Sequence, residues 1–209
     1  MLSDPFKTPA PAGGQTRWVT SAASDRYRRL ATRFTSLVSS VPVEAWTNPS
    51  PCVEWTAVEV FHHVVTTEAD LYSRMSFGSV LELGLTEPHD PAALATAWTQ
   101  VREVIQSTLD APEHSGLKYE GFFGPTTFAE TVDRFYSFDL VVHCWDLARA
   151  TGKRAYEVFD PAEIAKCQTD FADLSDTMRQ PALLDPELTV ADDADEATKF
   201  LAFLGRANN

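Results

Sequence analysis

Hydrophobic residues recur every three or four positions along much of the chain, which is the pattern of amphipathic helices. In the first such segment, one face of a helix that we expect over residues 21–39 carries Tyr27, Leu30, Phe34 and either Leu37 or Val38. The polar residues between them fall on the opposite face, which would lie in solvent. The segment therefore predicts a helix that packs its apolar side against other helices.

Capping residues mark the starts of two further helices. Thr56 and Glu59 have the spacing of a capping box, in which each side chain satisfies a free backbone N–H of the first turn, and their helix continues to about Met75. Asp90, followed by a proline at the first helical position, caps a third helix that continues to about Leu109. Helices of about 20 residues cross a small domain from end to end.

A fourth long helix follows a loop or short hairpin over residues 117–126. Thr127 and Glu130 form a second candidate capping box, and Gly152 is the expected end of this helix, since glycine adopts the left-handed conformation that closes many helices. Two shorter helices follow in the stretches "DPAEIAKC" and "DEATKFLAFLG".

Four long amphipathic helices with connections of moderate length predict an all-α fold, a four-helix bundle with a short helical C-terminal extension. Residues 1–20 are rich in Pro, Gly and Thr and are expected to form a flexible N-terminal arm. Residues 21–209 are expected to form a single domain, because a chain of 209 residues is long enough for one substantial core.

Charge and cysteine content narrow the classes of partner. The chain carries 30 acidic and 17 basic residues, a net charge of −13, which argues against nucleic acid and anionic membrane surfaces as partners. No apolar run approaches the roughly 20 residues of a membrane helix, and no signal-peptide core is visible, so we expect a cytoplasmic protein.

Cys52, Cys144 and Cys167 are widely spaced and odd in number, which suits reduced thiols. Glycine-rich phosphate loops and the G-x-S-x-G motif are absent from the sequence.

Asp139 and His143 are the first candidates for chemistry. They lie four residues apart, and therefore on one face of the fourth helix, among apolar positions such as Phe135 and Leu147. A carboxylate and an imidazole on an apolar face are costly to bury unless they are paired or bind a metal. Spacing alone leaves two interpretations open, a hydrogen-bonded pair and a pair of metal ligands.

His62 and His63 are adjacent in the second helix. Adjacent helical residues point about 100° apart, so only one of the two can enter a given site. Each is compatible with an ordinary core or boundary position, or with the third ligand of a metal site in the bundle interior. Three ligands from two helices would leave coordination positions open, as catalytic metal sites do.

Three other residues have simpler explanations. Asp146 lies three residues before Arg149, which predicts an exposed ion pair, with support of a ligand histidine as the alternative role. Cys52 and Cys144 are expected to be small buried apolar residues and not nucleophiles, since neither has an evident electropositive setting.

Three blocks of the sequence resemble a known family. The block "PSPCVEWTAVEVFHHVV" follows P-C-x-x-W-T and then seven residues, the last of which is the family's ligand histidine, here His63. The block "FDLVVHCWDLARATG" follows D-x-x-x-H-x-W-D-L-A-x-A-T-G, and "FLAFLGR" is similar to the ending L-L-A-F-L-G-R. Over about residues 21–206 the chain resembles the metal-binding branch of the DinB/YfiT-like superfamily that is related to the N-terminal domain of mycothiol-dependent maleylpyruvate isomerase.

The resemblance implies a four-helix bundle that holds one divalent metal through His63, Asp139 and His143. The family's isomerase has Glu at the position of Asp139, and many relatives use three histidines. The shorter Asp side chain reaches about one methylene less far but still binds divalent metals. Zinc is the expected ion, with nickel or iron as alternatives, because nitrogen and oxygen ligands with open positions suit all three.

The resemblance also implies mycothiol or another small thiol as a partner. The isomerase has a separate C-terminal domain, whereas the residues after Gly152 predict a short extension, so the resemblance supports the metal more than the named reaction. The first hypothesis is a thiol-dependent transferase or isomerase acting on a small electrophile. The alternatives are a non-catalytic metal-binding sensor or regulatory module, and a bundle whose polar residues only specify packing. A homodimer is compatible with such a bundle, although no stretch identifies an interface.

Overall fold

The computed structural model describes residues 21–75, 83, 85, 90–172, 179 and 184–208. The expected N-terminal arm, residues 1–20, lies outside these residues. Within them, the long helices are α1 (Ala22–Val38), α2 (Ala57–Arg74), α3 (Pro91–Asp110), and the segment formed by α5 (Phe128–Thr131) and α6 (Ser137–Ala150).

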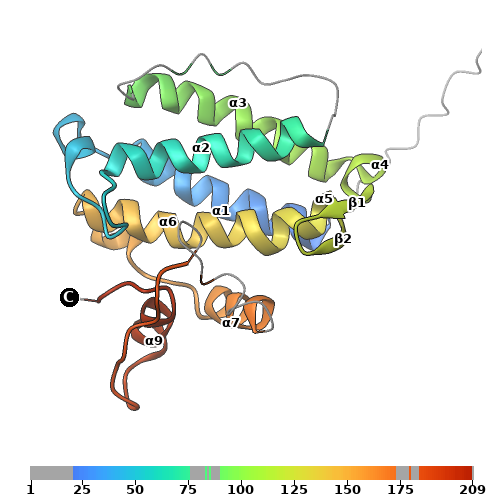
Figure 1. Cartoon of the computed structure of the whole chain (residues 1–209). Coiled ribbons are helices and arrows are strands. Elements are labelled where there is room, and N and C mark those ends of the chain that lie inside the picture. Colours follow the sequence, from blue (N-terminus) through green and yellow to red (C-terminus); the bar gives the residue numbers. More distant parts are fainter. Residues whose placement is uncertain are drawn as a thin grey trace, which may run out of the picture.

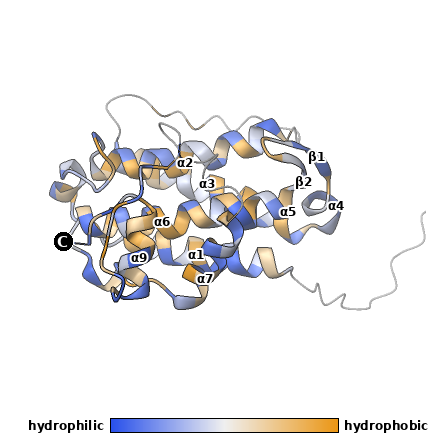
Figure 2. Cartoon of the chain, turned by 60° about the horizontal axis from the view of Figure 1, so that its bottom comes forward, coloured by the Kyte–Doolittle hydropathy of each residue, from blue (hydrophilic) through white to orange (hydrophobic). Residues whose placement is uncertain are grey.

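These four segments form a bundle (Figure 1). α1 packs against α3 and α6, and α2 packs against the same two helices, so each helix has two neighbours around one core. Figure 2 shows hydrophobic and hydrophilic residues alternating along the helices, as an amphipathic pattern requires. The predicted all-α fold is confirmed. In the described part of the chain, no helix is both long and apolar enough to cross a membrane.

Aromatic side chains fill the centre of the bundle. The ring of Phe34 on α1 lies 6.0 Å from that of Phe61 on α2 and 5.3 Å from that of Trp98 on α3, centroid to centroid. Trp46, from the 3₁₀ helix Val43–Thr47, stacks on Phe61 at 5.5 Å. Full burial of one large apolar side chain contributes roughly 1.5–3 kcal/mol, so these rings join three of the helices firmly.

The helix starts and stops agree with the sequence. Thr56 and Glu59 form a capping box at the start of α2, and Thr127 and Glu130 form another at the start of α5. After α6, Gly152 has a φ of +69°, the left-handed conformation that glycine adopts readily. The predicted boundaries of these helices are therefore confirmed to within a few residues.

The connection before α5 contains the short hairpin that the sequence allowed. After α4 (Pro112–Ser115), strand β1 (Lys118–Gly121) pairs antiparallel with β2 (Gly124–Thr127). Phe122 and Phe123 occupy the turn between the two strands. The hairpin lies at one end of the bundle (Figure 1).

The fourth helical segment departs from a regular α-helix. Between α5 and α6, residues Val132–Tyr136 form a π-helical turn, whereas the sequence predicted an unbroken α-helix. A π-turn accommodates an extra residue per turn and changes which positions face the core afterwards, and such turns occur frequently at functional sites. Asp139 lies in the first turn of α6, immediately after this feature.

The predicted C-terminal extension is present and packs on the outside of the bundle. Beyond the 3₁₀ helix Arg154–Tyr156, α7 (Pro161–Phe171) and α9 (Glu196–Phe203) contact each other on the α6 side (Figure 1). The ring of Phe159 lies 6.4 Å from Trp145 of α6 and 5.2 Å from Phe200 of α9. These rings attach the extension to the bundle.

Replacing Gly205 with alanine is expected to destabilise the protein more than replacing Gly152. Both glycines have positive φ, +76° and +69°, so each alanine incurs the cost of a left-handed backbone, about 1–2 kcal/mol. Only at Gly205 would the new Cβ overlap Cβ of Asp185 and come within 2.9 Å of the Pro186 carbonyl oxygen. Thermal denaturation of both variants measures the difference, and equal melting temperatures would contradict the close packing after α9.

Candidate metal centre

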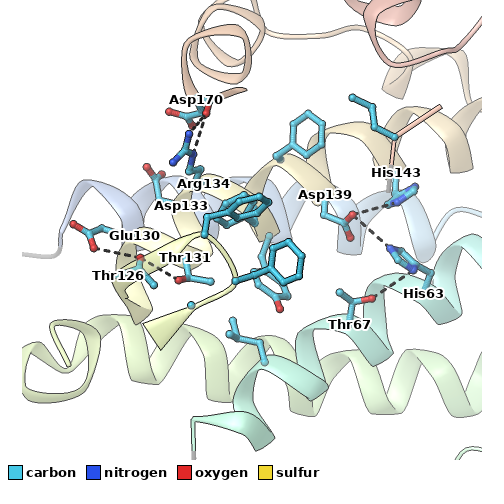
Figure 3. Close-up of a pocket in the computed structure, with 18 of the residues that line it drawn as sticks. His63, Thr67, Thr126, Glu130, Thr131, Asp133, Arg134, Asp139, His143 and Asp170 are labelled. Carbon is cyan, nitrogen blue, oxygen red and sulfur yellow. Dashed lines mark hydrogen bonds and ion pairs between the residues drawn. The ribbon is translucent and has the colours of Figure 1, made fainter. Parts of the chain in front are cut away.

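The three predicted metal ligands lie together. α2 packs against α6, so His63 on α2 faces Asp139 and His143, which lie one turn apart on α6 (Figure 3). Oδ1 of Asp139 is 3.5 Å from Nε2 of His63 and 3.3 Å from Nε2 of His143. Ligand atoms about 2 Å from a tetrahedral ion are roughly 3.4 Å from one another. The observed separations therefore suit a single metal ion, and the three residues form a group that could hold one.

The second nitrogen of each imidazole has its own contact. Nδ1 of His63 is 3.4 Å from Oγ1 of Thr67, one turn later on α2, and Nδ1 of His143 is 3.0 Å from Oδ2 of Asp146. Histidines that bind metals generally engage their other nitrogen in this way, which fixes the ring orientation and the tautomer. Both Nε2 atoms are consequently directed at Asp139.

The carboxylate of Asp139 is held in its charged form and is incompletely satisfied. Burial alone would raise its pKa, but His143 and His63 lower the pKa well below its ordinary range. Its Oδ2 is buried and has no hydrogen-bond partner in the described part of the chain. An unsatisfied buried oxygen is costly, and a bound cation would satisfy it. Two imidazoles and one carboxylate are a donor set that zinc, nickel and iron accept.

Asp146 does not form the exposed ion pair that the sequence predicted. It is fully buried and contacts His143, while Arg149 pairs with Glu157 at 3.0 Å. The prediction was wrong because the bundle covers one side of α6 and the C-terminal extension covers the other, so residues on nearly every face of α6 are buried. The contact with His143 is the one that the alternative role, support of a ligand histidine, would require.

Arg206, which sequence reasoning did not identify as functional, holds Asp146 from the segment after α9. Its Nε is 3.2 Å from Oδ1 of Asp146 and its Nη2 is 3.1 Å from Oδ2, a bidentate arrangement that is both strong and directional. Burial would raise the pKa of Asp146, but His143 and Arg206 lower it below its ordinary value. The signal available in the sequence was the block "FLAFLGR", which ends at this arginine.

Cys52 is buried, as predicted, but its surroundings are charged. Its Sγ is 3.2 Å from Oδ2 of Asp146 and 3.2 Å from Nη2 of Arg206. The expectation that this thiol lacks an electropositive setting was wrong, because the arginine is 154 positions away in the sequence.

Cys52, His143 and Asp146 form a second group that could hold a metal ion. In this group the guanidinium of Arg206 already neutralises the acid and would repel another cation. The group of His63, Asp139 and His143 is therefore the better candidate.

The favoured group borders a cavity of about 1200 Å³. The cavity is also lined by residues of the β1–β2 hairpin, the π-helical turn and the segment near Arg206. The ring of Trp55 lies 5.0 Å from that of His63 and 6.2 Å from that of His143, centroid to centroid. Cavities of several hundred cubic ångströms typically bind small molecules, and this one would give a reactant access to an ion at the cluster.

Glu68 is another buried carboxyl group, five residues after His63 on α2. It accepts a hydrogen bond from the hydroxyl of Tyr27. Burial raises its pKa, the hydrogen bond from Tyr27 lowers it and the charge of Asp139 raises it, with a resulting pKa of about 8. In the folded protein this carboxyl is therefore largely protonated at neutral pH.

Replacing Glu68 with glutamine is expected to remove a pH-dependent loss of stability. The pKa is about 8 in the folded protein against an ordinary 4.5, so between these values the unfolded chain releases a proton that the folded protein retains. Wild type therefore loses stability as pH rises through this window, by up to about 4 kcal/mol, whereas glutamine does not titrate. Urea denaturation at pH 5 and pH 8, with a chelator present, measures the difference in unfolding free energy between the two proteins. An identical difference at both pH values would contradict the raised pKa.

Helical bundles that present two histidines and an acid from facing helices are typical metal-site proteins. Residues 27–148 match the model of the family described as "Mycothiol maleylpyruvate isomerase N-terminal domain", and the match covers more than half of the 209 residues. The chain belongs to this family, which is DinB/YfiT-like, as the sequence resemblance indicated. The match includes His63, Asp139 and His143 and ends before Arg206.

Two proteins of Mycobacterium tuberculosis, from strains CDC 1551 / Oshkosh and H37Rv, are similar to the chain, each 24% identical over 127 residues. The similar region covers 61% of this chain and 66% of each relative, so the chain spans just under two thirds of their length. Both are described as uncharacterised proteins. No solved structure matches the chain.

Proposed function

We propose that the protein is a metal-dependent enzyme that activates a small thiol, mycothiol in keeping with its family, for transfer to a small electrophile or for its isomerisation. One divalent ion, zinc with nickel and iron as alternatives, would be held by His63, Asp139 and His143. The observation that carries this proposal is the convergence of these three side chains at the edge of a large cavity.

A divalent ion at this position would lower the pKa of a bound thiol or water, which supplies a nucleophile at neutral pH. The protein's own residues hold and orient the ligands. Thr67 and Asp146 fix the two imidazole rings, and Trp55 packs beside both rings. Three protein ligands leave at least one position of a tetrahedral site for the thiol.

A non-catalytic sensor or regulatory module is the alternative function. It requires a closed coordination sphere with a fourth protein ligand, as structural zinc sites have. Among the described residues, no fourth His, Cys, Asp or Glu joins the group of His63, Asp139 and His143. The cavity beside this group therefore favours the catalytic function.

Thiol chemistry with and without metal tests the proposal. Zinc-loaded wild type, chelator-treated wild type and zinc-treated His63→Ala are each incubated with mycothiol and a panel of small electrophiles. We expect consumption of the thiol, or isomerisation of an unsaturated electrophile, with zinc-loaded wild type alone. A protein that binds one zinc per chain but turns over no member of the panel would support the sensor and contradict the enzyme.

A further inference from the structure

The cavity continues from the candidate metal ligands along a wall of aromatic rings. Phe135 lies one turn before Asp139, and its ring stacks on that of Phe123 at 5.3 Å with the planes 17° apart. Phe122 lies against Phe123 at 4.9 Å, edge to face. In Figure 3, ring side chains occupy the space between the labelled ligands and the labelled polar residues at the other end. The apolar wall thus begins next to the place where chemistry would occur.

Two of these rings remain accessible. Phe122 is 82% exposed and Phe123 is 38% exposed, at the turn of the hairpin that borders the cavity. Removal of phenylalanine surface from water is favourable, so a ligand that covers these rings gains binding free energy. Exposed apolar side chains that gather beside a candidate reaction site are therefore a surface for a ligand with an apolar part.

The charges of the cavity disfavour a strongly anionic ligand. The described residues that line it include seven carboxylic acids and three arginines. Two of the arginines already donate to the protein, Arg134 to the carbonyl oxygen of Asp170 and Arg206 to Asp146. A dicarboxylate would therefore compete with protein acceptors for Arg134 and Arg206, which leaves Arg74 as the remaining arginine among the described lining residues.

Resting on the proposed function, we propose that the electrophile is an uncharged compound with an aromatic ring. The ring packs against Phe122, Phe123 and Phe135, and the reactive carbon lies at the metal-ligand end of the cavity. With a benzylic halide the reaction is a substitution. The thiolate sulfur forms a bond to the benzylic carbon, the carbon–halogen bond breaks, the halide leaves with the bonding pair, and the thiol proton passes to solvent.

The unreactive compound 4-nitrobenzyl alcohol tests ring binding without turnover. Calorimetry gives its Kd for wild type, with and without zinc, beside that of succinate as a dicarboxylate. We expect 4-nitrobenzyl alcohol to bind at least tenfold more tightly than succinate. Phe122→Ala and Phe123→Ala should each weaken its binding about three- to tenfold, the range of one aromatic contact. Val43→Ala, at a site 85% exposed and outside the cavity lining, is the matched control and should leave the Kd unchanged.

Two results would overturn the proposal of an aromatic electrophile. The first is that wild type binds succinate more tightly than 4-nitrobenzyl alcohol. The second is that both phenylalanine variants, shown to be folded by native circular dichroism, bind 4-nitrobenzyl alcohol as tightly as wild type. Turnover is measured separately, with mycothiol and either 4-nitrobenzyl chloride or 2-chlorosuccinate. Preferred turnover of the dicarboxylate would overturn the aromatic electrophile and leave the proposed function intact. Ring binding without zinc-dependent turnover of any electrophile would reject the proposed function.

Discussion

Replacing His143 with alanine is expected to weaken zinc binding by more than 100-fold while the protein remains folded. His143 supplies one of the three converging ligand atoms, and its other nitrogen contacts Asp146. Loss of an outer partner such as Asp146 typically costs 10–100-fold in metal affinity, and removal of the ligand itself should cost more. Competition with a chromophoric chelator measures the affinities, which should fall in the order wild type, Asp146→Asn, His143→Ala.

His62→Ala is the matched control for this experiment. The two histidines of α2 point about 100° apart, and only His63 belongs to the converging group. His62→Ala should therefore retain wild-type affinity, whereas His63→Ala should behave like His143→Ala. Loss of zinc in His62→Ala and retention in His63→Ala would contradict the assignment of ligands.

Replacing Arg206 with methionine is expected to affect both stability and metal affinity. Arg206 makes a bidentate contact with Asp146, which is fully buried, so its removal leaves this carboxylate with His143 as its remaining ion-pair partner in the described part of the chain. Breaking a buried ion pair by removing one partner costs about 3–5 kcal/mol. Because Asp146 also orients His143, we expect zinc affinity to fall about 10- to 100-fold. Urea denaturation and chelator competition measure the two effects.

A double variant separates the two roles of this contact. Asp146→Asn combined with Arg206→Met removes both charges of this pair. The free energy of unfolding should therefore recover in part, relative to Arg206→Met alone. The zinc affinity should stay low, because His143 is still not held in its orientation. Arg179 is another arginine of the extension and donates to the carbonyl oxygen of Phe203, but it does not contact Asp146. Arg179→Met is therefore the control, with near wild-type zinc affinity. Equal affinity losses in Arg179→Met and Arg206→Met would indicate a general loosening of the extension.

Local rules predicted the helices well because their signals lie within a few residues of one another. The capping boxes at Thr56 and Thr127 and the helix stop at Gly152 each depend on neighbouring positions, and all three are present. Asp139 and His143 share a face for the same reason, since their separation is one helical turn. His63 was selected over His62 by the family pattern, and the structure brings His63 to the cluster.

The parts that sequence reasoning missed depend on contacts between distant segments. The environment of Asp146 is decided by Arg206, 60 positions later, and that of Cys52 by the same arginine. Hydrophobic periodicity did not predict that Asp146 is buried. Nearly all sides of α6 are covered, so its inward and outward faces do not differ in burial. The π-helical turn Val132–Tyr136 escaped prediction because its residues fit an ordinary amphipathic helix.

Anomalous X-ray diffraction at the zinc edge, from crystals of zinc-loaded protein, tests the central claim most directly. The account predicts one peak per chain, about 2 Å from Nε2 of His63, Nε2 of His143 and a carboxylate oxygen of Asp139, with an open position toward the cavity. A peak among Cys52, His143 and Asp146 would contradict the assignment of the site. If crystals grown at a saturating zinc concentration show no ordered zinc in the helical bundle, that result would contradict the metal centre itself.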